Sequence, residues 1–165
     1  MKFGRILKHL AVPHRVALRS FPRAALTKIE SAIRDSEQQH DGELRFAVEG
    51  GLHLASLWHG QSPRARAVEL FSQLRVWDTE HNSGVLLYVQ LVDRRIEIVA
   101  DRGINAKVEQ ASWDGICNRM QAAFRQRRYE QGALAAIDEV TELLARHFPP
   151  VGTNPNELPD KPVVL

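Results

Sequence analysis

The chain has a single cysteine, Cys117, and no long apolar run. One cysteine excludes an internal disulfide, so the cysteine content does not call for an oxidising compartment. A membrane-spanning helix needs roughly 20 apolar residues, and no run in the sequence approaches that length. The first residues, MKFGRILKHLAVPHR, also lack the continuous apolar segment of a secretory signal. We therefore expect a cytoplasmic protein with no signal peptide and no transmembrane helix.

Acidic residues are absent from the start of the chain, where the first is Glu30. The net charge of the whole chain, +2, is small. Because no acidic residue precedes Glu30, the positive charge is concentrated in residues 1–22. At helical spacing, Phe3, Ile6, Leu7 and Leu10 lie opposite Lys2, Arg5 and Lys8. This pattern predicts a peripheral contact of residues 1–12 with an anionic inner-membrane surface. The alternative is a basic tail that docks loosely on its own domain.

The signatures of several well-known enzyme classes are also missing. The sequence contains no G-x-x-x-x-G-K-[ST], no G-x-S-x-G, no H-E-x-x-H and no paired C-x-x-C. A standard nucleotide-binding enzyme is therefore disfavoured.

The 165 residues, of which 44% are hydrophobic and 25% charged, suit one globular domain. We expect a basic segment at 1–22, a single α/β domain at 23–148 and a proline-rich tail at 149–165. The tail shows no apparent core of its own.

Apolar periodicity predicts the elements of the domain. Period-two alternation predicts a strand at 43–49 with one buried face. The run GVLLYVQLV at 84–92 is apolar on nearly every residue, which predicts a central strand covered on both faces. The run RRIEIVA at 94–100 alternates and predicts a less buried neighbour, so the two runs form an antiparallel hairpin. Helices are expected near 20–40, 63–76, 111–126 and 129–147. The segment LHLASLWHG is ambiguous and is read as a strand extension or an edge strand. The order predicts an α/β sandwich with a small mixed sheet, in which strands 43–49 and 84–92 are parallel.

The hairpin geometry brings several polar residues to one end of the sheet. Residues equidistant from a turn near Asp93 face each other, so Gly84 lies near Arg102 and Gly103. The residues collected there are Asp78, Glu80, His81, Asn82 and Asp101, with His40 and Glu43 close by, whereas Asp93 lies at the opposite end.

This set of residues suggests two kinds of chemistry. Asp78, Glu80, Asn82 and Asp101 offer the oxygen ligands of Ca²⁺ or Mg²⁺, and histidine would admit Zn²⁺ or Mn²⁺. Asp101, Arg102 and His81 are the candidate catalytic residues for hydrolysis. The alternative is that these side chains only hold the loop through local turns.

Three weaker patterns have ordinary explanations. Glu37 and His40 share a helical face, as in some metal sites, but a histidine also suits a helix C-terminus. The arginines at 119, 125, 127 and 128 resemble a nucleic-acid patch, yet a surface helix needs a solvated face, so nucleic acid is not the expected partner. Cys117 lies on an apolar stripe and is expected in the core.

Residues 43–148 resemble the TPM domain, which occurs in a thylakoid-lumen photosystem-repair phosphatase, bacterial envelope proteins and a nematode receptor modulator. The matching motifs are Ala67 to Phe71 in a helix, Asn82-Ser83-Gly84-Val85-Leu86-Leu87 at a strand start, Asp101-Arg102-Gly103-Ile104, and Phe124, Tyr129 and Gly132. The resemblance implies a three-layer α/β/α sandwich and, for some members, acid phosphatase activity or divalent-metal binding. Asn82-Ser83 stands where the family commonly has Asp-Asn, and Glu109-Gln110 where it has Thr-Asp, so two carboxylates are missing. The chain resembles a short type of bacterial member without a membrane anchor.

Three functions are compatible with these observations. The favoured one is a non-catalytic module that binds a protein or ligand, in membrane-stress or envelope maintenance. The alternative is a metal-assisted phosphatase that uses residues 78–82 and Asp101, with Arg102 holding a phosphoryl oxygen. Nucleic-acid binding is the third.

Overall fold

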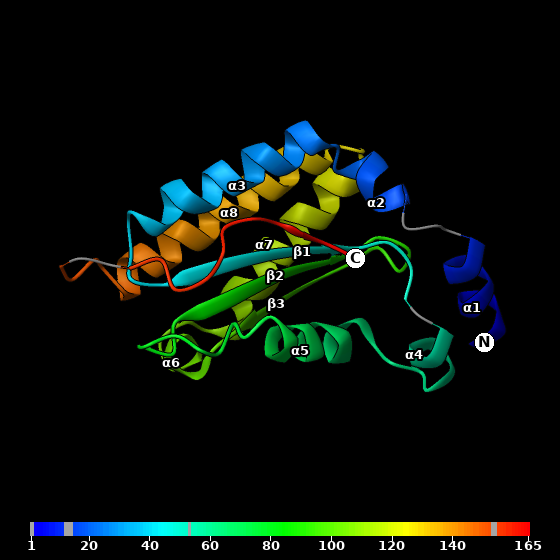
Figure 1. Cartoon of the computed structure of the whole chain (residues 1–165), viewed down its shortest axis with the longest axis horizontal. Helices are drawn as coiled ribbons and strands as arrows, with labels where there is room; N and C mark the ends of the chain where they lie inside the picture. Colours follow the sequence, from blue (N-terminus) through cyan, green and yellow to red (C-terminus); the bar gives the residue numbers. More distant parts are fainter. Residues whose placement is uncertain (1, 12–14, 53, 153–154) are drawn as a thin grey trace.

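The computed structural model describes residues 2–11, 15–52, 54–152 and 155–165. One open sheet has the strand order β3-β2-β1-β4, with helices on both sides (Figure 1). The strands are β1 (Glu43–Glu49), β2 (Gly84–Gln90), β3 (Arg95–Ala100) and β4 (Val163–Val164). The helices are α1 (Lys2–Ala11), α2 (Arg15–Ser20), α3 (Arg23–Glu37), α4 (Leu54–Trp58), α5 (Pro63–Gln73), α6 (Arg102–Asn105), α7 (Gln110–Arg125) and α8 (Tyr129–His147).

The register of the sheet confirms the predicted pairings. β1 and β2 are parallel, with Glu43 opposite Gly84, and β2 and β3 are antiparallel, with Val85 opposite Ala100. The sheet therefore has two distinct ends. We call the one with residues 78–83 and 101–103 the loop end, and the one with residues 91–94 the turn end.

The sheet is the middle layer of the predicted three-layer α/β/α sandwich. Helices α3, α7 and α8 cover one face and α5 covers the other (Figure 1). Because side chains alternate along a strand, β2 sends Val85, Leu87 and Val89 into the larger core under α3, α7 and α8. Leu86 and Tyr88 enter the smaller core under α5. The apolar sequence of β2 thus reflects burial on both faces, as expected for a central strand.

The prediction that the strand at 43–49 has only one buried face is wrong. All seven residues of β1 are buried, including Glu43, Arg45 and Glu49. Helix α5 and the C-terminal segment cover the polar face that the alternation assigned to solvent. Glu49 pairs with Arg66 of α5, and Glu43 accepts hydrogen bonds from the backbone of residues 157 and 158.

The C-terminal segment adds a fourth strand that the sequence analysis did not anticipate. β4 pairs in parallel with β1, and the Leu165 N–H donates to the Val48 carbonyl at 2.9 Å. Leu158 is buried in the smaller core. The segment therefore covers what would otherwise be an open edge of β1, which protects the edge from pairing with another chain.

The described residues of the ambiguous segment LHLASLWHG, 52 and 54–60, form no strand. The segment contains the short helix α4, in which Leu57 is buried while Leu54 and Trp58 are exposed. Its apolar residues recur at intervals of three and four, which suits one helical turn, and α4 contacts α1.

The N-terminal residues form two helices, α1 and α2, that lie beyond the turn end of the sheet (Figure 1). Residues 1 and 12 of the predicted membrane segment, and 12–14 of the basic segment, lie outside the described residues. Within the described ranges, no helix has the length and apolar character to cross a bilayer.

Candidate functional site

The loop end brings Asn82, Asp101 and Arg102 together as the sequence predicted. The Asp101 N–H donates to the Gly84 carbonyl at 2.9 Å, and the Gly103 N–H donates to the Asn82 carbonyl at 3.2 Å. These bonds join the two loops across the hairpin. Asp101 and Asn82 therefore lie beside each other although they are far apart in the sequence.

Arg102 forms hydrogen bonds with both predicted ligands, Asn82 and Asp101. Its Nε donates to Asn82 Oδ1 at 2.9 Å, and its backbone N–H donates to Asp101 Oδ1 at 2.7 Å. Asp101 thereby caps α6, which is a structural use of a carboxylate at a helix N-terminus. Asp101 Oδ2 is buried without a hydrogen-bond partner.

The other predicted ligands of the loop end do not converge on this place. Asp78, Glu80 and His81 are exposed, and the Glu80 N–H donates to Glu157 Oε2 at 2.9 Å. Across the described ranges, no group of three or more His, Cys, Asp or Glu side chains is arranged to hold a metal ion.

The described side chains around Asp101 do not form a ready set of ligands for a divalent cation. The Asn82 side-chain oxygen already accepts a hydrogen bond from the Arg102 guanidinium. Asp101 Oδ2 is the one oxygen of this pair without a hydrogen-bond partner, whereas Ca²⁺ takes six to eight oxygen ligands. The Ca²⁺ or Mg²⁺ site and the catalytic roles of Asp101, Arg102 and His81 stay predictions.

Glu43 lies at the loop end but beneath the C-terminal segment. Its two oxygens accept from the N–H groups of Glu157 and Leu158 at 3.3 and 3.1 Å. Burial raises its pKa from 4.5 to about 7, although those hydrogen bonds act in the opposite direction. Glu43 is thus a docking residue for the chain's own C-terminal segment.

Glu37, which the sequence paired with His40, lies next to this segment as well. Its Oε1 accepts from the Leu44 N–H at 3.0 Å, and burial raises its pKa to about 8. His40 contacts Ser36 Oγ at 2.9 Å, and burial lowers the pKa of its imidazole to about 4. Glu37 and His40 therefore do not form a pair of metal ligands, because the Glu37 side chain bonds to β1 and the His40 side chain contacts Ser36.

The raised pKa values of Glu37 and Glu43 predict that stability falls as pH rises. The folded protein retains protons that the unfolded chain releases above pH 4.5, so the free energy of unfolding should decrease between about pH 4.5 and about pH 8. Glu37→Gln keeps the acceptor for Leu44 and should flatten this decrease, with a gain of about 2–4 kcal/mol at pH 9. Urea unfolding at pH 6, 7.5 and 9 measures the effect, and Glu142→Gln, an exposed change, is the control. Parallel curves for Glu37→Gln and the unmodified protein would refute the prediction.

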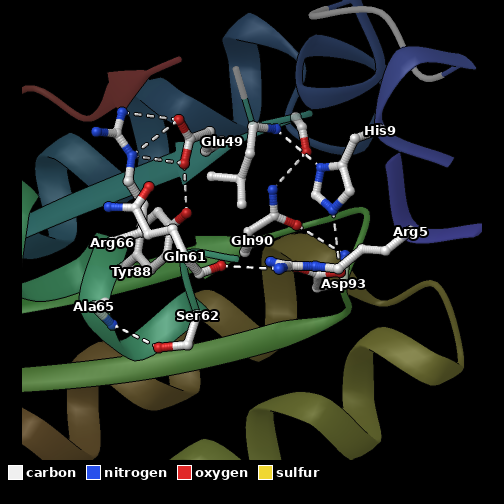
Figure 2. Close-up of polar contacts among 12 residues, drawn as sticks. Arg5, His9, Glu49, Gln61, Ser62, Ala65, Arg66, Tyr88, Gln90 and Asp93 are labelled. Carbon is white, nitrogen blue, oxygen red and sulfur yellow. Dashed lines mark hydrogen bonds and ion pairs between the residues drawn. The ribbon is translucent and has the colours of Figure 1, made fainter. Parts of the chain in front are cut away.

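Asp93 lies at the turn end, as predicted, and holds α1 in place (Figure 2). Arg5 Nη2 donates to Asp93 Oδ2 at 2.7 Å, and His9 Nε2 lies 3.1 Å from Asp93 Oδ1. The Nδ1 atom of His9 accepts from the Leu52 N–H at 2.9 Å. Burial acts to raise the pKa of Asp93, but the contacts with Arg5 and His9 outweigh it and hold this pKa below its usual range.

A buried triad that sequence reasoning missed joins α5 to the sheet. Arg66 Nη2 donates to Glu49 Oε1 at 2.9 Å, and the Tyr88 hydroxyl donates to Glu49 Oε2 at 2.5 Å (Figure 2). Burial, followed by the charge of Glu49, raises the pKa of Tyr88. The sequence signal was a tyrosine, Tyr88, within the mostly aliphatic β2.

The four arginines of the predicted patch differ in their contacts. Arg119 pairs with Glu139, and Arg128 bonds to Gln126. Arg125 and Arg127 instead line a large groove at the turn end. Cys117 is half-buried, and burial raises the pKa of its thiol to about 12, in keeping with the predicted core position.

The chain forms an α/β/α sandwich in which β1 and β2 are parallel and β2 and β3 form a hairpin. Backbone hydrogen bonds join the two loops at the loop end. Together these features define a class of domain. A family model of the TPM domain matches residues 19–143. Ten chains of solved structures match this protein, whereas a search of curated proteins found no match. The BA42 protein of the psychrophilic bacterium Bizionia argentinensis is 31% identical, with a TM-score of 0.74 over 85% of this chain and 92% of that chain. The N-terminal domain of a P. gingivalis protein shares the fold at 19% identity, with a TM-score of 0.61 over 87% of this chain and 96% of that one. The chain belongs to the TPM domain family.

Proposed function

We propose that this TPM domain is a non-catalytic binding module that docks on an anionic membrane surface through α1 and α4. The orientation of α1 is the observation that carries the proposal. Its Arg5 and His9 face the domain, and His9 is only 4% exposed, whereas Leu7 is 65% exposed. A surface helix normally buries its apolar side chains and exposes its charged ones. Charge therefore holds α1 on the domain while an apolar side chain points outward.

Helix α4, which contacts α1, adds two exposed apolar side chains. Leu54 is 53% exposed and Trp58 is 69% exposed, and an interval of four residues puts both on one helical face. α4 and α1 are in contact at the N-terminal end of the molecule (Figure 1). Tryptophan favours a membrane interface because its ring is apolar and its N–H is polar.

The charge around this surface suits anionic lipid rather than a neutral partner. Helices α1, α2 and α4 contain no aspartate or glutamate, and Lys8 of α1 is exposed. A basic side chain near an anionic bilayer contributes about 1 kcal/mol to binding. A role in membrane-stress or envelope maintenance would follow from such docking.

Trp58→Ala should weaken binding to vesicles of phosphatidylglycerol and phosphatidylcholine by about ten-fold or more, since it removes one large apolar side chain from the contact. Co-sedimentation at a fixed lipid concentration measures the change.

Trp77→Ala is the matched control, because Trp77 is 51% exposed but precedes the loop end of the sheet. It should leave binding unchanged, and pure phosphatidylcholine vesicles should bind far less protein. Equal losses in the two variants, or equal binding to neutral vesicles, would count against membrane docking.

The alternative, a metal-assisted phosphatase at the loop end, has less support. Asp101, Arg102 and Asn82 are adjacent, but Asp101 caps α6 and Arg102 takes the Asn82 oxygen. The geometry of α1 and α4 therefore favours the binding module.

A further inference from the structure

A groove of about 1210 Å³ opens at the turn end of the sheet. Its lining comes from separate parts of the chain: the junction of α2 and α3, the turn from β2 to β3, the end of α7 and the start of α8. The turn end is also where the parallel strands β1 and β2 reach their carboxyl ends. Open α/β sheets bind ligands at that position.

Arginines dominate the charge of this groove. Its lining includes Arg19, Arg94, Arg95, Arg125 and Arg127, all of them exposed. The one carboxylate in the lining, Glu130, pairs with Lys28 at 2.6 Å. None of these arginines forms an ion pair or a side-chain hydrogen bond with the described residues. Arg95 has one electrostatic partner, because its charge acts to lower the pKa of Glu97. The groove therefore carries a surplus of unpaired guanidinium groups.

The walls between the arginines are apolar and aromatic. Val89 and Ile96 of the sheet are buried beneath the groove. The rings of Phe124 and Tyr129 meet edge to face at 5.1 Å, and both pack against Phe21. This aromatic cluster fixes the wall, so the groove combines a rigid apolar body with a basic rim.

Two of the rim arginines have an unfavourable backbone conformation. Arg94 has φ 53° and Arg127 has φ 59°, in the left-handed region that favours glycine. Residues held in this region cluster at functional sites, where the surroundings maintain them.

We propose that this groove binds a phosphate monoester that carries an apolar body. One guanidinium group can donate two parallel hydrogen bonds to the oxygens of a phosphate. A phosphate monoester also has nearly two negative charges at pH 7, so several arginines can bind the same phosphate. The apolar wall and the volume, which exceeds the 300–1,000 Å³ of ordinary ligand sites, leave room for an alkyl or aromatic group. The site is separate from the membrane contact of α1 and α4, and neither proposal depends on the other.

The test is an NMR titration of the full chain with hexyl phosphate, inorganic phosphate and hexanol at constant ionic strength. Hexyl phosphate should shift the amides of residues 89–96 and 121–131 and bind at least about ten-fold more tightly than inorganic phosphate, because the alkyl chain is buried. Hexanol should bind weakly. Equal affinity for hexyl phosphate and inorganic phosphate, or shifts confined to other residues, would overturn the proposal.

The double variant Arg94→Gly and Arg127→Gly removes two guanidinium groups without straining the fold, because glycine suits a positive φ. It should weaken hexyl phosphate binding at least about ten-fold, since charge-assisted contacts are lost. Arg75→Gly is the matched control, as Arg75 has φ 54° and is exposed but does not line the groove. Equal effects of the double variant and the control would overturn the proposal.

Further arms distinguish the source of the ligand. Binding of hexyl phosphate in solution supports a free phosphate ester. A loss of binding to phosphatidic acid vesicles in the double variant, without a loss for phosphatidylglycerol vesicles, supports the same chemistry in a lipid headgroup. A single-stranded oligonucleotide that binds through these arginines while both of those arms fail would overturn the proposal in favour of nucleic acid. Trp58→Ala should leave hexyl phosphate binding intact, which separates this site from the membrane contact.

Discussion

Arg66→Met is expected to lower the free energy of unfolding by about 3–5 kcal/mol. Glu49 is 1% exposed and receives three hydrogen bonds from the side chain of Arg66. Without this partner its carboxylate would remain buried with only the Tyr88 hydroxyl as a donor. The cost arises because a buried charge without a countercharge loses its hydration and gains little in return.

The double variant Arg66→Met and Glu49→Leu should recover much of that loss, because it removes both charges together. Arg119→Met is the control, since Arg119 also pairs with a glutamate but on the exposed surface. Urea unfolding of all three variants measures the differences. A loss for Arg66→Met as small as that for Arg119→Met would show that the triad is not a stabilising contact between α5 and the sheet.

Gly84→Ala is the second large effect, with an expected loss of at least about 3 kcal/mol. A Cβ atom at this position would lie 1.9 Å from the Val76 carbonyl oxygen and 2.9 Å from the Val76 carbonyl carbon. These are backbone atoms next to a paired strand, so they cannot move aside as a flexible side chain does. The glycine of the Asn82-Ser83-Gly84 motif therefore has a packing role, whatever the loop end binds.

Gly4→Ala tests whether the effect depends on the site, because a Cβ atom at Gly4 would have no neighbour within 4 Å. It should be neutral or slightly stabilising, as alanine favours a helix more than glycine does. Thermal unfolding compares the two variants. A Gly84→Ala protein as stable as the unmodified protein would contradict the close packing of Val76 on β2.

The sheet was predictable because its signals are local. The apolar run of β2 indicated a central strand, and a tight turn near Asp93 set the pairing with β3. The right-handed crossover rule then placed β1 parallel to β2, and the structure adds the register, with Glu43 opposite Gly84. From the hairpin the sequence also predicted that Asn82 and Asp101 lie at the same end of the sheet.

The coverage of β1 was not predictable because it depends on distant segments. Alternation of Glu43, Arg45 and Glu49 with apolar residues is typical of a strand with one face in solvent. Here Arg66 of α5 and the N–H groups of residues 157 and 158 satisfy two of these charged side chains. A pattern within one strand cannot report partners that lie elsewhere in the chain.

The candidate sites divide in the same way. Topology alone placed Asp101 and Asn82 at the same end of the sheet, but the hydrogen bond from Arg102 to Asn82 and the capping of α6 by Asp101 required the three-dimensional structure. The groove draws Arg19, Arg94 and Arg127 from three separate segments. Only tertiary structure brings such residues to one place.

Fluorescence quenching by lipids with brominated acyl chains tests the membrane contact most directly. In a Trp77→Phe variant, Trp58 is the exposed tryptophan, because Trp113 is only 2% exposed. We expect strong quenching of this variant by anionic vesicles and little quenching by neutral ones. A Trp58→Phe variant, which retains Trp77, should bind more weakly and show little quenching when bound. Quenching of Trp77 rather than Trp58 in the bound protein would contradict docking through α1 and α4.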